Sequence, residues 1–131
     1  MANKVHIINI GGKERTLKYT FKSARELSRH SAILHGGKVV DWTSTVDDDS
    51  IDGMAIMVCY GLKHEQKDLV PDTVLEWFEA ARAEGLQVMK DFVLPAKRAL
   101  GESGAMGTYF TYNDDGRFTK DLAGKDGAAG V

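Results

Sequence analysis

The chain has few of the features that mark secreted, membrane-embedded or nucleic-acid-binding proteins. It has a single cysteine, Cys59, which excludes an internal disulfide framework. Its longest apolar runs are a few residues, far short of a bilayer span, and residues 1–20 lack the segments of a signal peptide. The net charge of −2 predicts no binding to nucleic acid or to an anionic membrane. We therefore expect a protein of the reducing cytoplasm.

The 131 residues suffice for one domain with a modest core. We expect an α+β fold that is mainly α, with an N-terminal β-hairpin followed by a bundle of about four helices in residues 1–101. Residues 102–131 are rich in glycine and aspartate and predict a flexible tail. This tail nevertheless holds four of the eleven aromatic residues. It is therefore also a candidate for a conditional hairpin, ordered against its own domain or against a partner, with a turn at residues 112–117.

The opening segment predicts the hairpin. Residues 5–10 form one β-prone run, and a Gly11-Gly12 turn separates it from a run in which apolar and polar residues alternate. The apolar members of the second run are Leu17, Tyr19 and Phe21. Because Ile7 and Ile8 are both apolar, we expect the first strand to be covered on both faces.

Four helices are predicted to follow. Ser23 and Glu26 predict a capping box for the first, and residues 38–48 predict an irregular connection that holds Trp42 against the core. Asp49 or Ser50 would cap the second, whose apolar residues on most sides place it centrally or at an interface and also suggest self-association. Pro71 would begin the third helix. A fourth, over residues 86–100, should be kinked or divided at Pro95.

Few residues are arranged for catalysis or metal binding. Cys59 lies in mid-helix with no cation nearby, which favours a buried small hydrophobe over a nucleophile. The segment from Asp48 resembles the start of a calcium loop but has Cys59 in place of the final glutamate, so a solvated helix start is favoured. The histidines show no metal-ligand spacing. We expect no enzymatic activity, no metal and no cofactor.

Large apolar residues are the remaining candidates for function. They either pack in the core or form a protein interface, where aromatic residues carry much of the binding energy and methionines adapt to a partner. The candidates for partner binding are Trp42, Met54, Met57, Trp77, Tyr109, Phe110 and Tyr112.

Two segments resemble the tail assembly chaperones of long-tailed bacteriophages, close to the version in gene transfer agents. The first is Ile10-Gly-Gly-Lys-Glu-Arg-Thr-Leu-Lys-Tyr-Thr-Phe21, which leads into a helix. The second and more specific is Met57-Val-Cys-Tyr-Gly-Leu-Lys-His-Glu65, followed by a proline-capped helix. The similarity spans about residues 5–100.

The resemblance implies a small, largely helical protein of the host bacterial cytoplasm that is absent from the mature virion. It implies binding to the tape measure protein, recruitment of tail tube subunits and no catalysis. The aromatic tail from Tyr109 does not match the family. The alternatives from the sequence are a structural part of the virion tail, such as a tube or connector subunit, and a small enzyme whose site is split between helices.

Overall fold

The computed structural model describes residues 5–38, 42–114, 116 and 118–119. Helices make up 56% of the chain and an antiparallel two-stranded hairpin stands at its N-terminus, which confirms the coarse prediction of a mainly helical fold. The described elements are β1 His6–Ile10, β2 Lys13–Leu17, α1 Phe21–Leu34, α2 Trp42–Val46, α3 Ile51–Leu62, α4 Pro71–Ala83, the π-helical turn η1 Met89–Val93, α5 Leu94–Ser103, β3 Thr111–Tyr112 and β4 Phe118–Thr119.

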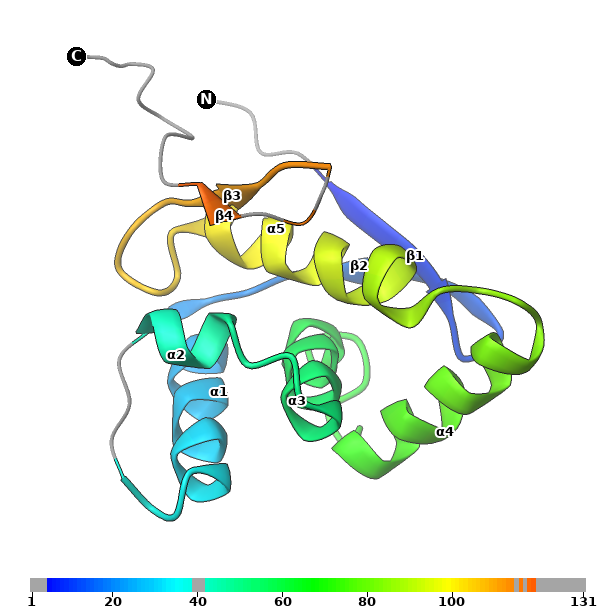
Figure 1. Ribbon diagram of the computed structural model, residues 1–131, viewed down its shortest axis with the longest axis horizontal. Helices are drawn as coiled ribbons and strands as arrows, with labels where there is room; N and C mark the ends of the chain where they lie inside the picture. Colours follow the sequence, from blue (N-terminus) through cyan, green and yellow to red (C-terminus); the bar gives the residue numbers. More distant parts are fainter. Residues whose placement is uncertain (1–4, 39–41, 115, 117, 120–131) are drawn as a thin grey trace.

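The centre of the fold is α3. It contacts α1, α4, α5, η1 and β2, and Figure 1 shows α1 and α4 on either side of it with α5 crossing it. Eight of its twelve residues are buried, so its apolar sides are covered within one molecule and the central position is the correct alternative. The apolar residues of α3 are therefore not an argument for self-association.

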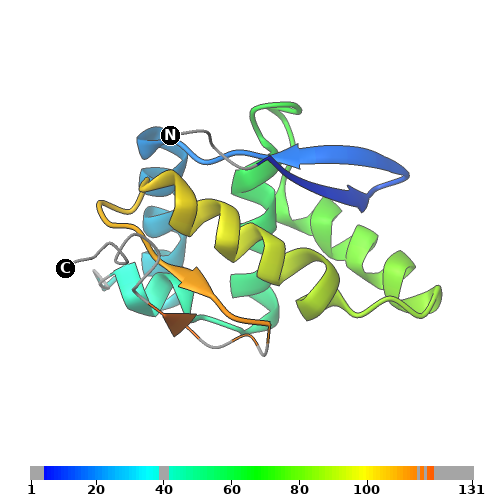
Figure 2. The same ribbon diagram turned by 90° about the horizontal axis from the view of Figure 1, so that it is seen from above.

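The hairpin covers one side of this core. β1 and β2 pair with Ile8 opposite Arg15, and Gly11 and Gly12 form the turn with φ of 65° and 83°, which glycine adopts without strain. Ile8 and Ile10 are buried but Ile7 is 48% exposed, so the expectation that both faces are covered was wrong. In Figure 2 the hairpin lies along the outside of the helices, which leaves its outer face in water.

The first helix begins earlier than the sequence suggested. The N-cap is Thr20, whose side chain accepts a hydrogen bond from the Ser23 amide, while the Ser23 hydroxyl accepts one from the Thr20 amide. Ser23 is therefore the third helical residue, and the proposed pair of Ser23 and Glu26 is wrong. The same shift places Phe21 at the first helical position with 73% of its surface exposed, not in a half-buried strand.

The later helices follow the predicted boundaries more closely. Ser50 caps α3 by accepting a hydrogen bond from the Gly53 amide, and Pro71 begins α4. The segment from 86 to 100 divides at Pro95, which lacks an amide hydrogen and crowds the preceding turn. The backbone relieves this crowding with the wider turn η1, in which the Leu94 amide reaches the Met89 carbonyl.

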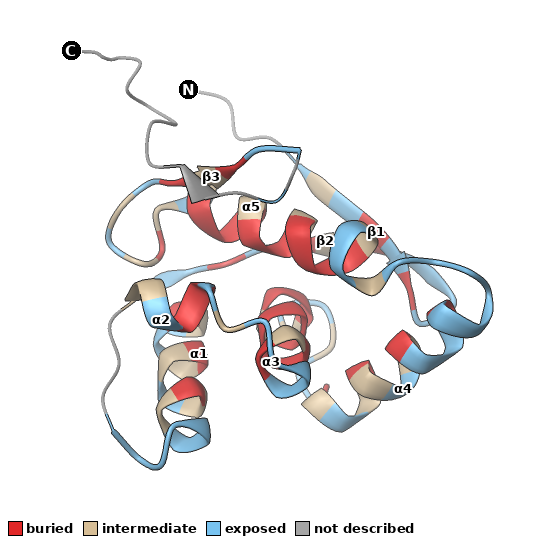
Figure 3. Ribbon diagram, in the orientation of Figure 1, coloured by how far each residue is buried: buried red, intermediate tan, exposed pale blue. Residues whose placement is uncertain are grey.

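Two connections are more ordered than expected. Residues 42–46 form the short helix α2 in place of an irregular connection, although Trp42 does pack against the core as predicted. Residues 105–112 return over α5, and β3, which Figure 3 shows partly in red, has a buried position at Tyr112. Of the two alternatives for this segment, a flexible tail and a hairpin ordered against its own domain, these residues follow the second. Phe110 is fully buried, and β3 pairs with β4 as a short hairpin. The predicted flexibility of residues 120–131 lies outside the described residues.

Candidate functional site

The two segments that resemble phage chaperones lie against each other. The Lys18 amide donates to the Gly61 carbonyl at 2.9 Å, and the Thr16 amide donates to Glu65 Oε2 at 3.2 Å. His64 Nε2 donates to the Thr16 carbonyl at 2.7 Å. The end of β2 is therefore bonded to the end of α3 through residues of both motifs, and we call this contact the motif junction.

Gly61 allows the junction to close. A Cβ atom at this position would lie 2.6 Å from Tyr19 Oη and 2.9 Å from Leu17 Cδ2, which is closer than van der Waals contact. Tyr19 Oη in turn donates to the Met57 carbonyl at 2.5 Å, and burial raises the pKa of Tyr19 far above its usual value. Gly61 is therefore required in this helix because the Tyr19 and Leu17 side chains occupy the space that a larger side chain would need.

A buried arginine extends the junction towards α4. Arg15 Nε donates to the Ile10 carbonyl at 2.9 Å, and its Nη1 donates to Gln66 Oε1 at 3.0 Å. Its guanidinium also lies 4.3 Å from the centre of the Trp77 ring, within cation–π range. Trp77 therefore serves as packing for Arg15 and for the hairpin turn. An open hollow of about 400 Å³ beside it is lined in part by Leu86 and Phe92.

An open groove of about 530 Å³ borders the junction. We call it the lysine groove, and it is lined by Lys18, Thr20, Lys22, Ser23, Glu26, Tyr60, Lys63, His64 and Lys67. Both motifs supply lining residues, from the entry to α1 and from the end of α3. The groove thus holds more cations than acids in a chain whose net charge is −2.

An apolar hollow lies on the other side of α1. We call it the Phe21–Trp42 hollow, and its volume is about 310 Å³. Its lining is mostly apolar, with Arg25 and Ser28 as the charged and polar members, and consists of Phe21, Ala24, Arg25, Ser28, Trp42, Ala105, Met106 and Gly107. The Trp42 ring stacks on Phe110, with 5.0 Å between ring centres, so the fully buried Phe110 fixes one wall. The exposed ring of Phe21 also lines the hollow. The hollow can accept an apolar side chain, and it holds no group arranged for chemistry.

The predicted partner-binding residues separate into two groups. Trp42, Met54, Trp77 and Tyr109 retain accessible surface, and of these Tyr109 is 55% exposed. Met57, Phe110 and Tyr112 are buried. All three pack in the core, since Met57 faces inward from the central helix and the other two lie in the segment that packs on α5.

The sequence interpretation missed Phe21 and Met106 as surface-forming residues. The signal for Phe21 was present, because Thr20 and Ser23 have the spacing of a helix cap and would have placed Phe21 outside the strand. No local pattern brings Met106 towards Phe21, since that contact depends on the path of the chain after α5.

The groups considered for chemistry have structural roles. Burial raises the pKa of Cys59 to about 11, and its Sγ donates to the Leu69 carbonyl, so the thiol is protonated at neutral pH. Asp48 accepts a hydrogen bond from the Ser50 amide and forms part of the entry to α3. His30 contacts the Tyr60 hydroxyl, and His6 contacts Glu102. Within the described ranges, no three His, Cys, Asp or Glu side chains are grouped to hold a metal ion.

None of the helices in the described part of the chain is long and apolar enough to cross a membrane.

Comparison of the chain with protein-family models, with curated proteins and with solved structures finds no match. The likeness to phage chaperones therefore rests on the two motifs alone.

Proposed function

We propose that this chain is a tail assembly chaperone of the long-tailed phage type, which binds the tape measure protein and catalyses no reaction. The resemblance over residues 5–100 supports the proposal. The motif junction adds to this support, because Lys18 and Gly61 join the two segments that carry the resemblance. Neighbouring residues of the same motifs form the lysine groove and one wall of the Phe21–Trp42 hollow.

The observation that carries the proposal is the Phe21–Trp42 hollow. Phe21 leaves 73% of its surface in water, and burying a side chain of this size is worth roughly 1.5–3 kcal/mol. An apolar side chain from a partner helix would cover Phe21 and reach towards Trp42 and Met106. Amphipathic helices commonly bind in this way, with anchors three or four residues apart. The tape measure protein, a long apolar helical chain in the family that this sequence resembles, is the partner we propose.

Recruitment of tail tube subunits is the second part of the proposed role. It requires a surface that stays accessible when the hollow is occupied. The open hollow beside Trp77 is such a surface. It is lined by the hairpin turn and by α4, and Figure 1 shows α4 on the other side of α3 from α1.

Co-expression with the tape measure protein encoded in the same genome tests the proposal. We expect the chaperone to keep that protein in the soluble fraction and to co-purify with it. Phe21→Ser should reduce the soluble amount by about tenfold, because one anchor is worth about 1.4 kcal/mol or more. Ile33→Ser is the matched control, since Ile33 is 71% exposed on the same helix but outside the hollow. No association with the wild-type protein, or equal losses in both variants, would contradict the proposal.

Proteomics of purified particles tests the location. A chaperone of the host cytoplasm should be absent from mature virions, whereas a tube or connector subunit should be present in many copies. No specific feature of the fold favours the structural alternative. In the described residues the longest strands have five residues, and strands pair only within two-stranded sheets, while a closed β-ring needs much more strand.

A further inference from the structure

The lysine groove has a charge that is opposite to that of the rest of the protein. Four lysines and one glutamate line it, which gives +3, so the remainder of a chain with net charge −2 carries −5. A concave surface lined by one sign of charge concentrates the electrostatic potential and attracts ions or segments of the opposite sign. The Phe21–Trp42 hollow does not require this charge, so the groove calls for a separate explanation.

Three of the four lysines have ammonium groups available for a ligand. Lys63 donates to the Leu69 carbonyl at 2.7 Å and thereby closes the turn after α3. Lys18, Lys22 and Lys67 are exposed, and their ammonium groups form no hydrogen bond or ion pair with any described residue. They come from three separate segments, which are the end of β2, the first turn of α1 and the loop before α4.

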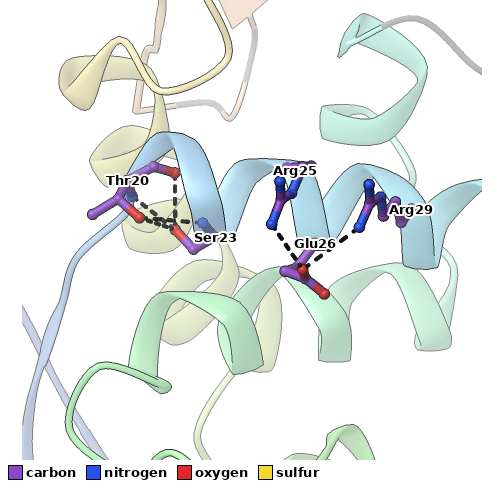
Figure 4. Close-up of polar contacts among 5 residues, drawn as sticks. All are labelled: Thr20, Ser23, Arg25, Glu26 and Arg29. Carbon is purple, nitrogen blue, oxygen red and sulfur yellow. Dashed lines mark hydrogen bonds and ion pairs between the residues drawn. The ribbon is translucent and has the colours of Figure 1, made fainter.

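The acidic side chains near the groove are engaged elsewhere. Figure 4 shows Glu26 between Arg25 and Arg29, with its Oε2 at 3.7 and 3.9 Å from their guanidinium nitrogens. Glu65 accepts the hydrogen bond from the Thr16 amide. Asp68 follows Lys67 in the chain but does not line the groove. The lysines are therefore not neutralised by carboxylates of their own groove.

The start of α1 adds to the positive potential. The amide end of a helix carries a partial positive charge, which acidic residues in the first turn usually offset. The first turn of α1 has no acidic residue and instead includes Lys22. Thr20 and Ser23 cap each other at this end through the hydrogen bonds drawn in Figure 4. Both residues also line the groove.

One aromatic ring, that of Tyr60, lines the groove, and we call it the floor of the groove. The ring is held at its edge by His30, whose Nδ1 is 3.2 Å from the Tyr60 hydroxyl. Lys63 Nζ lies 5.8 Å from the centre of that ring. Burial raises the pKa of Tyr60, so the ring is neutral in the physiological range. A small inorganic anion would use the ammonium groups but not this floor.

We propose that the lysine groove binds an acidic peptide segment of a partner protein, with carboxylates on Lys18, Lys22 and Lys67 and one apolar side chain over Tyr60. This inference goes beyond the proposed function, because it concerns a different surface and does not depend on which protein supplies the segment. A peptide matches both chemical features of the groove, charge and apolar floor. Long lysine side chains suit it as well, since their methylene stems pack on apolar groups while the ammonium stays in water.

Fluorescence anisotropy with a short labelled peptide, in which glutamates flank a central leucine, tests the proposal. We expect saturable binding that weakens as salt rises from roughly 0.05 to 0.5 M. Combined substitution of Lys18→Glu, Lys22→Glu and Lys67→Glu should weaken binding at least about tenfold. The matched control is the combination of Lys13→Glu, Lys38→Glu and Lys90→Glu. It changes the net charge equally at exposed lysines outside the groove.

Three probes separate the peptide from other occupants. A peptide with glutamine in place of glutamate, and one with serine in place of leucine, should each bind more weakly. Equal binding by the glutamine peptide, or equal losses in the two lysine combinations, would overturn the proposal. Binding of inorganic phosphate or duplex DNA without binding of the acidic peptide would also overturn it. So would light scattering that shows a dimer, lost in the groove variant, without any peptide binding. Failure of the tape measure experiment leaves all of these outcomes unchanged.

Discussion

The first turn of α1 borders two surfaces of different chemistry, and adjacent residues of that turn line them. Phe21 faces the apolar hollow, whereas Lys22 lines the lysine groove. Residues 21, 24, 25 and 28 follow one face of the helix, and residues 22, 23 and 26 follow the next. One helix thus separates a mostly apolar surface, which also includes Arg25, from a groove lined by four lysines. An amphipathic partner with acidic flanks could contact both surfaces without a change in the fold.

The two surfaces also differ in how they are supported. The Phe21–Trp42 hollow stands on the core, because Trp42 stacks on the buried Phe110. The lysine groove stands on the motif junction, which consists mainly of hydrogen bonds between β2 and the end of α3. We therefore expect core mutations to affect the hollow first and loss of the α1 cap to affect the groove first.

The largest expected effect comes from a substitution that unfolds the protein and so abolishes both surfaces. Val58 is fully buried in α3, and Val58→Asp places a charge there without a partner, at a cost of about 3–5 kcal/mol. Because a small domain has little more stability than this, the variant should be unfolded by circular dichroism. Val70→Asp is the control, since Val70 is 49% exposed. A folded Val58→Asp protein would show that α3 is not the centre of the core.

High pH should lower the stability of the fold through two buried tyrosines, Tyr19 and Tyr112. Burial raises the pKa of Tyr19, which packs against Gly61 at the motif junction, and burial and the nearby Asp47 carboxylate raise that of Tyr112, whose ring contacts Phe110. A tyrosine with a raised folded-state pKa keeps its proton when the unfolded chain has lost it. Its contribution is thus complete below about pH 10 and decreases above that value. Denaturation midpoints should therefore start to fall at about pH 10 and continue to fall as the pH rises further, and less steeply in Tyr19→Phe.

Trp42→Ala should damage the hollow and leave the groove intact. Trp42 is partly buried on the core, so its removal should cost about 2 kcal/mol, less than a fully buried tryptophan would. Denaturant unfolding measures this loss, and anisotropy with the acidic peptide measures the groove. A variant that loses peptide binding while remaining folded would show that the two surfaces are coupled.

The cap of α1 gives a smaller and more local effect. Thr20→Ala removes the side chain that accepts from the Ser23 amide, so it should cost about 1 kcal/mol. Ser23→Ala removes the reciprocal bond to the Thr20 amide and should cost less, because Thr20 is exposed and water can replace that bond. A larger loss of stability in Ser23→Ala than in Thr20→Ala, measured by chemical denaturation, would show that Ser23 is the more important capping residue.

The smallest effect is expected for Phe21. Because it is largely exposed, Phe21→Ser should change the free energy of unfolding by less than about 0.5 kcal/mol, although it should reduce partner binding. A loss of several kcal/mol would instead assign Phe21 to the core. Thermal denaturation of this variant beside Lys22→Ser compares the two sides of α1 directly.

Local signals predicted the parts of the fold that depend on nearby residues. Ser50 marks the start of α3 because its side chain accepts a hydrogen bond from a free helix amide. Pro71 marks the start of α4, and Pro95 interrupts the later helical segment, because proline has no amide hydrogen to donate within a helix. The Thr20 cap was missed because the alternation through Tyr19 appeared to continue to Phe21. The apolar segment around Met57 predicted a central or interfacial helix but could not distinguish the two.

The sequence by itself determined the hairpin, the starts of α3 and α4 and the mainly helical class, because turns, caps and periodicity act over a few residues. Only the tertiary structure decided that Phe110 is buried beneath Trp42, that Arg15 packs on Trp77, and that lysines from three segments surround one groove. These contacts join residues far apart in the chain, and their positions follow from how the helices pack around α3.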